Sequence, residues 1–285
     1  MENQRILVIG GNGYIGRGLV KKLKLNNFDV TVLLRKNIPG YESKNIVGDL
    51  LDKACLLKKV RNFDLVVNLA SIIRTVHKGR YQENILGLRN VIDAMGANSI
   101  KRIIYLSTQN VNLAGKGYYA ASKVLCEKIL KKTNLDYVII RPSIVYGIDK
   151  QNDFYRLVSL IDKWRVAPII GSGENKMQPV LKDDLVNVII LAAKNFNKNQ
   201  IIEVNGKDTV SMNQIIDYIS RSLKVAPIKI HAPLAILKIF KKFIPFDIDG
   251  YTEDRISRNC AENKAFSSFF DNLDAMISLC KEKQG

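Results

Sequence analysis

The sequence predicts an α/β protein built on a doubly wound parallel sheet, with a smaller, mostly helical C-terminal region. Three observations predict it. Apolar, strand-like runs alternate with amphipathic stretches through the first half, a glycine-rich turn joins the first run to the first helix, and the alternation ends after Pro142. Strands that alternate with helices imply right-handed crossovers, and such crossovers produce a parallel sheet.

The strand runs of the first half are rich in β-branched residues and nearly apolar throughout, as strands covered on both faces are. They occupy residues 5–9, 29–34, 64–70, 101–106 and 136–141. Amphipathic periodicity between them predicts helices at 14–25, 81–97 and 118–132.

Beyond Pro142 the pattern is irregular. It predicts helices at 154–164, 183–194 and 212–223, a strand at 201–204 and a mostly helical tail from Ala226. We therefore expect a larger unit of residues 1–165, to which 178–206 return, and a smaller unit of 166–177 and 207–285.

Composition limits the classes of protein to consider. Every long apolar stretch is interrupted well short of the ~20 residues that a spanning helix needs. Because the glycine turn follows the first apolar run almost at once, we also expect no secretory signal. The four cysteines form no CxxC pair and there are only two histidines, so we expect reduced thiols, no metal centre and a cytoplasmic location.

The net charge of +17 suggests an acidic partner, although scattered Lys and Arg pairs are also typical of solvated helix faces. No aromatic-interleaved basic cluster accompanies the charge, and we expect no nucleic-acid partner. The segment 232–246 is basic and strongly apolar. It suits either a peripheral contact with an anionic membrane or a helix that covers the substrate pocket, the hypothesis that we favour.

The strongest binding motif is the turn after the first strand run. Gly10, Gly13 and Gly16 form GxxGxxG at the start of a predicted helix, with Tyr14 and Ile15 inside the motif. Missing Cβ atoms let the backbone approach a pyrophosphate, and the helix N-terminus supplies N–H groups and a positive dipole end. The turn predicts a site for NAD(H) or NADP(H).

The end of the second strand run bears on the choice of cofactor. An acidic residue there would bond the ribose hydroxyls of NAD, but the sequence has Arg35, which could pair with the 2′-phosphate of NADP. This favours NADP(H) and leaves NAD(H) open, because an ordinary exposed basic pair explains Arg35-Lys36 equally well. Further residues placed to flank the cofactor are Asp49, Leu50, Leu69, Ala70 and Ser71.

The strongest catalytic signal is Tyr119-Ala120-Ala121-Ser122-Lys123, which puts a phenol and an ammonium one helical turn apart on one face. A nearby cation stabilises phenolate, so Tyr119 could exchange a proton with a substrate hydroxyl or carbonyl. Lys123 would also hold the nicotinamide ribose. By itself the YxxxK spacing is common, and its position after Leu106-Ser107-Thr108 makes it informative.

Together these residues resemble the extended or atypical short-chain dehydrogenase/reductase superfamily, in its NAD-dependent epimerase/dehydratase branch. The matching motifs run from Arg5 to about Gly206. In chain order they are Gly10-x-x-Gly13-x-x-Gly16, Gly48-Asp49-Leu50, Asn68-Leu69-Ala70, residues 84–91, Ser107-Thr108-x-x-Val111, Tyr119-x-x-x-Lys123, Arg141-Pro142-Ser143-x-Val145-Tyr146-Gly147 and Asp183-Asp184-Leu185.

The resemblance implies a Rossmann-type fold and a set of residue roles. The larger unit, 1–165 with 178–206, would bind NAD(P), and the smaller unit, 166–177 and 207–285, would bind or cover the substrate. Thr108 would hydrogen-bond the reacting oxygen, Tyr119 would be the general acid/base, and Lys123 would orient both Tyr119 and the cofactor. Asn84, Pro142 and Ser143 would join the cofactor site. Family members often dimerise through the helix that bears the Tyr, so a homodimer is also implied.

Two departures bear on the substrate. Only residues 109–118 separate Thr108 from Tyr119, and Met177 stands where nucleotide-sugar enzymes often carry an Arg that contacts the substrate diphosphate. The chain is also similar to the NAD(P)H-binding accessory-subunit group of respiratory complex I.

The leading hypothesis is an NAD(P)-dependent oxidoreductase or epimerase/dehydratase-type enzyme acting on a hydroxyl/carbonyl group of a small-molecule substrate by hydride transfer. The alternative is a non-catalytic NADP(H)-binding structural or assembly factor.

Overall fold

The computed structural model describes residues 3–39, 41, 43–234, 237, 253–256 and 266–282. The chain divides into two compact units. Unit 1 comprises Met1–Val111, Tyr118–Arg141 and Val186–Ile202, and unit 2 comprises Asn112–Gly117, Pro142–Leu185 and Glu203–Gly285. The functional division into a cofactor region and a substrate region stays a prediction.

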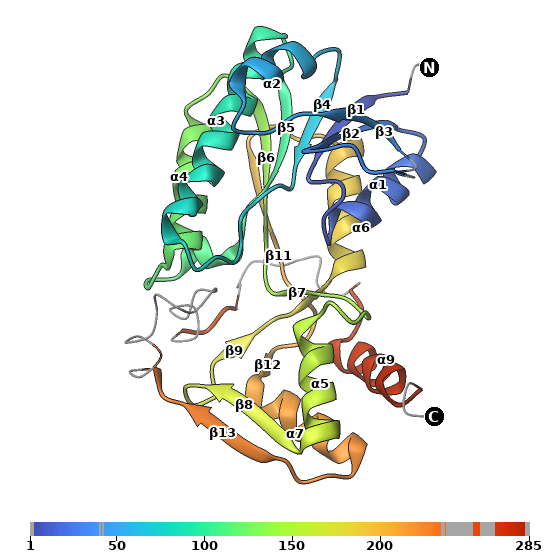
Figure 1. Ribbon diagram of the computed structural model, residues 1–285, viewed down its shortest axis with the longest axis vertical. Coiled ribbons are helices and arrows are strands. Elements are labelled where there is room, and N and C mark those ends of the chain that lie inside the picture. The colour runs from blue at the N-terminus through green and yellow to red at the C-terminus, as the bar shows by residue number, and fades with distance from the viewer. Residues whose placement is uncertain are drawn as a thin grey trace. The chain divides into compact units, whose positions relative to one another are not determined.

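Unit 1 is built on a seven-stranded sheet in the order β11-β6-β5-β4-β1-β2-β3 (Figure 1). The strands are β1 (Arg5–Ile9), β2 (Asp29–Leu34), β3 (Lys44–Val47), β4 (Leu65–Asn68), β5 (Arg102–Leu106), β6 (Asp136–Pro142) and β11 (Gln200–Val204). Strands β1 to β6 pair in parallel. Because β1 lies between β2 and β4, the strand order reverses at β1/β4, where doubly wound sheets bind ligands.

Helices cover both faces of this sheet (Figure 1). One face carries α2 (Lys53–Lys59), α3 (Gln82–Ala97) and α4 (Tyr118–Lys131) over a buried cluster that includes Leu7, Val66 and Ile103. On the other lie α1 (Gly16–Leu25) and α6 (Lys182–Lys194), which meet where Lys22 Nζ donates to Asn187 Oδ1 at 3.0 Å. Short 3-10 turns at Lys78–Tyr81 and Gln109–Asn112 precede α3 and α4. The fold class expected from the sequence is confirmed.

Unit 2 combines helices with short strand pairs. Its helices are α5 (Asp153–Trp164), α7 (Met212–Leu223) and α9 (Phe269–Lys281), whose apolar faces meet in one cluster with Tyr146, Phe154 and Phe269 in edge-to-face contact. The strand pairs are β7 (Val145–Tyr146) with β10 (Val180–Leu181), β9 (Lys176–Met177) with β12 (Val210–Ser211), and β8 (Val166–Ile170) with β13 (Ile228–Ala232).

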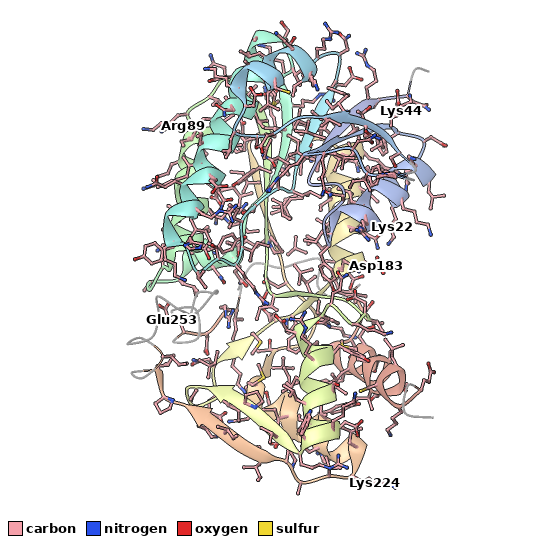
Figure 2. All side chains as sticks on the ribbon, viewed as in Figure 1. Lys22, Lys44, Arg89, Asp183, Lys224 and Glu253 are labelled. Carbon is pink, nitrogen blue, oxygen red and sulfur yellow. The ribbon has the colours of Figure 1, made fainter. Side chains whose placement is uncertain are left out.

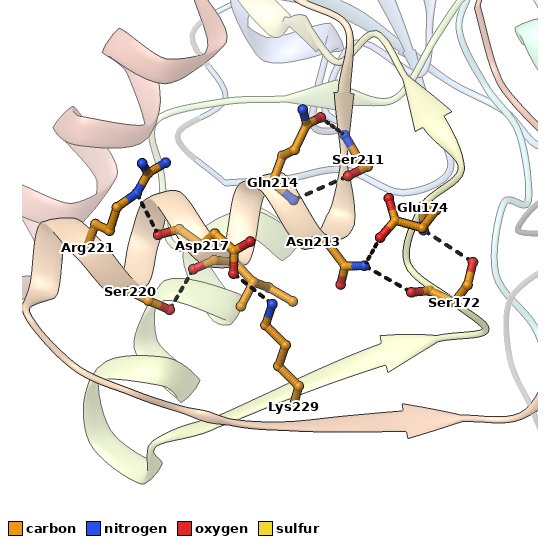
Figure 3. Close-up of polar contacts among 10 residues, drawn as sticks. Ser172, Glu174, Ser211, Asn213, Gln214, Asp217, Ser220, Arg221 and Lys229 are labelled. Atoms are coloured by element: carbon orange, nitrogen blue, oxygen red, sulfur yellow. Dashed lines mark hydrogen bonds and ion pairs between the residues drawn. The ribbon is translucent and has the colours of Figure 1, made fainter.

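The ends of α7 and α9 show how unit 2 is held together. A capping box between Ser211 and Gln214 opens α7, and Lys224 ends it in the left-handed region, at φ 55° (Figure 3 shows the capping box). The N-terminus of α9 is capped from another part of the chain, because Asp208 Oδ2 accepts from Phe269 N at 2.6 Å and from Ser268 Oγ at 3.0 Å.

The helical prediction for the tail is wrong at 228–232, which form β13 and pair with β8 in parallel. The pairing partner lies about 60 residues earlier in the chain, where a local pattern cannot reveal it. The prediction is confirmed for α9. Most of the segment 232–246 lies outside the described residues, and none of the described helices is long and apolar enough to cross a membrane.

Candidate cofactor and catalytic site

The glycine turn of unit 1 follows β1 and is built from backbone atoms in close contact. Gly10 has φ +81°, and a Cβ added there would lie 3.0 Å from Ala70 N, just beyond β4. A Cβ on Gly16 would lie 2.2 Å from Gly10 O, and Gly13 N donates to Gly10 O at 3.0 Å. The turn therefore excludes side chains at Gly10 and Gly16 and brings the ends of β1 and β4 together.

The start of α1 suits an anion. Helix α1 begins at Gly16, so Tyr14 and Ile15 lie in the turn before it, and no side chain caps the helix N-terminus. Its first turn contains no acidic residue. Uncapped N–H groups at a positive dipole end are what a phosphate group needs. The residues present thus fit the diphosphate of a dinucleotide.

The segment after β4 adds a second feature that fits a ligand. Ser71 Oγ is buried and makes no hydrogen bond within the described part of the chain. Asn84 fixes this segment, because its Oδ1 accepts from Ile72 N at 2.7 Å and its Nδ2 donates to Ser122 Oγ at 3.2 Å. Asn84 therefore joins the end of β4 to the helix that carries Tyr119 and Lys123.

Arg35 is exposed directly after β2, and its charge helps to lower the pKa of Glu83, after the larger effect of the hydrogen bond from Arg80. Asp49 is exposed and accepts from Leu51 N at 2.9 Å. Leu50 packs on Gly87 of α3, where an added Cβ would lie 3.1 Å from Leu50 Cβ. These positions are in unit 1, and their roles toward a cofactor stay predictions.

Lys123 is the most deeply buried charged group of the candidate site, with 1% of its surface exposed. Its Nζ donates to Leu106 O at 2.7 Å and to Tyr105 Oη at 3.1 Å. Burial lowers the pKa of Lys123 to about 8, and the same burial raises the pKa of the Tyr105 phenol. Lys123 is therefore held at the end of β5, where the loss of solvent disfavours its charged form.

Tyr119 and Thr108 belong to the same part of unit 1. The Tyr119 ring lies 6.3 Å from the Tyr81 ring, and Ser122 Oγ donates to Tyr119 O at 2.7 Å. Thr108 follows β5 and is buried, and its Oγ1 accepts from Asn110 N at 3.3 Å. Unit 1 therefore holds Thr108 just after β5, and Tyr119 and Lys123 on α4.

Sequence reasoning missed two buried partners of this region. Tyr105, on β5, contacts Lys123 but belongs to no motif. Glu127 lies four residues after Lys123, and its carboxylate accepts from Ser107 Oγ at 2.6 Å and from the Arg141 guanidinium at 2.6 and 3.0 Å. Through Ser107 and Arg141, Glu127 joins α4 to the end of β5 and to β6. Its position four residues after Lys123, on the same face of the helix, is the sequence signal that could have identified it.

Pro142 and Ser143 belong to unit 2, where Ser143 N donates to Val204 O at 2.9 Å. Met177, in the same unit, has Arg255 as its parallel bridge partner, and Arg255 N donates to Lys176 O at 2.7 Å. Close by in the sequence, Glu253 accepts from Gly115 N and Ala114 N, which lowers its pKa (Glu253 is labelled in Figure 2). Arg255 thus brings a basic residue to Met177 from 78 positions further along the chain.

No group of three or more His, Cys, Asp or Glu side chains among the described residues could hold a metal ion. The comparison with protein families identifies the chain. Residues 6–205 match the NAD dependent epimerase/dehydratase family. The chain belongs to this family. The membership confirms the resemblance inferred from the motifs, while the narrower likeness to the complex I subunit is not shown.

Relatives and solved structures agree with the family. The chain is 26% identical over 93% of its length, and 84% of the relative's, to N-acetyl-alpha-D-glucosaminyl-diphospho-ditrans,octacis-undecaprenol 4-epimerase of Escherichia coli O157:H7. It is 26% identical to UDP-glucose 4-epimerase of Vibrio cholerae, over 83% and 81% of the two chains. The structure of Thermus thermophilus UDP-glucose 4-epimerase in complex with NAD matches with a TM-score of 0.75 at 19% identity, covering 98% and 99% of the chains.

Proposed function

We propose that the chain is a nicotinamide-dinucleotide-dependent epimerase-type enzyme that acts on a hydroxyl-bearing carbon of a diphosphate-linked sugar. The observation that carries the proposal is the buried Lys123, which lies one helical turn after Tyr119 and donates to Leu106 O, two residues before Thr108, in a chain of this family. The relatives named above supply the substrate class, since both of their names describe epimerases of diphosphate-linked sugars.

A nicotinamide cofactor held by the glycine turn would supply reversible hydride transfer with a substrate carbon. Tyr119 Oη takes the hydroxyl proton as the carbonyl forms and gives it back when the carbonyl is reduced. Thr108 Oγ1 donates a hydrogen bond to the same oxygen. The Lys123 ammonium favours the phenolate of Tyr119, and Tyr105 and Leu106 O keep Lys123 in place.

The glycine turn and the start of α1 would hold the cofactor diphosphate. Arg35 would grip the 2′-phosphate of NADP(H), so we propose that the site accepts NADP(H) as well as the NAD(H) named for the family. Arg255 is the backbone bridge partner of Met177 and would offset the missing Arg at that position. This weakens the sequence argument against a sugar diphosphate.

The test uses purified full-length protein. Mass spectrometry of the released nucleotide identifies the cofactor, and turnover is measured on nucleotide-linked and lipid-diphosphate-linked sugars. We expect Tyr119→Phe to lower turnover by about 10²- to 10⁴-fold, because proton transfer is lost, while nucleotide affinity changes little. Tyr118→Phe, at the neighbouring position, is the matched control and should retain turnover.

Full turnover in Tyr119→Phe would overturn the catalytic assignment. A protein that carries bound nucleotide but oxidises and epimerises none of these substrates would support the non-catalytic, structural hypothesis instead. Recovery of NAD(H) alone, with no measurable affinity for NADP(H), would overturn the role of Arg35 and leave that of Tyr119 intact.

A further inference from the structure

The small parallel sheet of unit 2 has one face that is apolar across both strands. Side chains alternate along a strand, so Val166, Pro168 and Ile170 of β8 share a face. In register, Ile228 pairs with Val166, Ile230 with Pro168 and Ala232 with Ile170. The outer face of the β8–β13 sheet therefore consists of three aligned pairs of apolar side chains.

The opposite face of this sheet packs against the rest of unit 2. Ala167 and Ile169 are buried in the cluster formed by α5, α7 and α9. On β13, Lys229 reaches Asp217 of α7, with Nζ and Oδ1 at 2.7 Å (Figure 3). The apolar outer face is thus the side that α7 does not cover.

Exposure on this face is uneven, because Val166, Ile170 and Ala232 are half-buried whereas Pro168 and the two isoleucines of β13 are exposed. Ile228 is 69% exposed and Ile230 is 52% exposed, although both are large apolar residues. Trp164 ends α5 beside the starts of both strands, since Arg165 O accepts from Ile228 N at 2.8 Å, and it is 72% exposed. Exposed large apolar residues that gather at one end of a sheet are typical of an interaction site.

The surrounding charge points to an anionic partner. Trp164 lies between Lys163 and Arg165, and Lys224 precedes β13 at the end of α7 (labelled in Figure 2). Asp162 pairs with Arg165 and Asp217 with Lys229, so the charges of these four residues balance, and Lys163 and Lys224 add positive charge beyond them. From Arg221 to Phe246 the sequence contains six basic residues and no acidic one.

We propose that the outer face of the β8–β13 sheet, with Trp164, docks the protein on an anionic lipid surface. Tryptophan favours the level of the lipid headgroups, isoleucine side chains enter the acyl boundary, and basic residues are attracted by anionic lipids. The proposal concerns a surface formed by described residues and does not depend on the chemistry assigned to unit 1.

Trp164 is the only tryptophan of the chain, so its fluorescence reports on this surface directly. With vesicles of phosphatidylglycerol at low salt, we expect the emission to shift to shorter wavelength and the protein to float with the vesicles. Phosphatidylcholine vesicles and high salt should reduce both signals, because the electrostatic attraction is lost. The double variant Ile228→Glu/Ile230→Glu should lower vesicle partitioning by about tenfold or more.

Leu25→Glu is the matched control, since Leu25 is a 72% exposed apolar residue on α1 of unit 1, and it should leave partitioning unchanged. Thermal melts monitored by circular dichroism confirm that each variant is folded. Unchanged Trp164 emission and no flotation at low salt would overturn the proposal. Flotation that survives the double variant would assign binding to another segment, and a spectral shift that follows protein concentration without lipid would assign the face to a second copy of the chain.

Discussion

The two units of the chain are held in shape by different kinds of contact, backbone packing in unit 1 and side-chain contacts between distant segments in unit 2. Unit 1 depends on backbone geometry at the ends of parallel strands, where Gly16 has no room for a Cβ. Unit 2 depends on side chains from distant segments, such as Asp208 at the start of α9. The difference teaches that a motif in the sequence reports backbone constraints well, whereas assembly by distant side chains leaves little local signal.

The largest effect is expected in the glycine turn. In Gly16→Ala the new Cβ would collide with Gly10 O, so we expect a loss of about 3 kcal/mol in the free energy of unfolding and at least about a hundredfold in nucleotide affinity. Gly18→Ala, in the same helix, is the control. Its Cβ would meet only Val186 at 3.9 Å, and it should stabilise by about 0.5 to 1 kcal/mol. Urea unfolding and nucleotide titration measure both, and equal stability of the two variants would contradict a backbone constraint.

A second prediction concerns the buried charge of unit 1. Lys123 has a pKa of about 8 in the folded protein and near ~10.4 when unfolded, so the unfolded state binds more protons between these values and stability rises with pH there. Relative to Lys123→Met, the wild type should gain about 3 kcal/mol across this window. Urea unfolding at several pH values measures the difference.

The groups around the ammonium are Cys126 and Glu127, which raise the pKa of Lys123, and the Tyr105 phenol, which accepts from Lys123 Nζ. The Lys123 charge in turn lowers the pKa of Cys126, so the comparison with Lys123→Met reports on this coupled group as a whole. The exposed Lys128→Met on the same helix should keep the wild-type pH dependence. A difference between wild type and Lys123→Met that stays flat from pH 7 to 10.5 would mean that Lys123 is not desolvated.

The smallest effect is expected in unit 2. Asp208→Ala removes the acceptor for Phe269 N and Ser268 Oγ, and should cost about 1 to 2 kcal/mol, as the loss of a helix cap does. Asp217→Ala breaks only the surface pair with Lys229 and should cost less than about 1 kcal/mol. Thermal unfolding checks both, and equal costs would show that the cap from Asp208 is no stronger than a surface ion pair.

Most of unit 1 could be predicted from the sequence because each element has its own periodic pattern. Strands β1 and β2 have the predicted bounds, and α3 and α4 differ from prediction by a residue at one end. Strand β3 was missed, since Lys44–Val47 is only half-buried and too short for a pattern. Helix α2 was also missed, because seven residues are too few to show a helical period.

The sequence predicts those residues of the candidate site that belong to motifs, and it does not predict those that contact them from elsewhere in the chain. Spacing predicts Thr108, Tyr119 and Lys123 as site residues, and their roles stay predictions. The structure locates Thr108 just after β5 and the other two residues on α4. Tyr105 gave no signal, because an aromatic residue in a buried strand is typical of any core. Arg255 gave none either, since its partner Met177 lies far away in the sequence.

The capping of α9 by Asp208 also has a consequence for the order in which the chain can fold during synthesis. The last residue of unit 1 is Ile202, whereas the core of unit 2 includes Phe269, Leu273 and Met276 of α9. Residues from Tyr146 to Ile169 leave the ribosome before the last segment of unit 1, but they cannot complete their core until α9 has been synthesised. Unit 2 therefore completes its core later than unit 1, and its aromatic cluster stays open to chaperones until α9 has been synthesised.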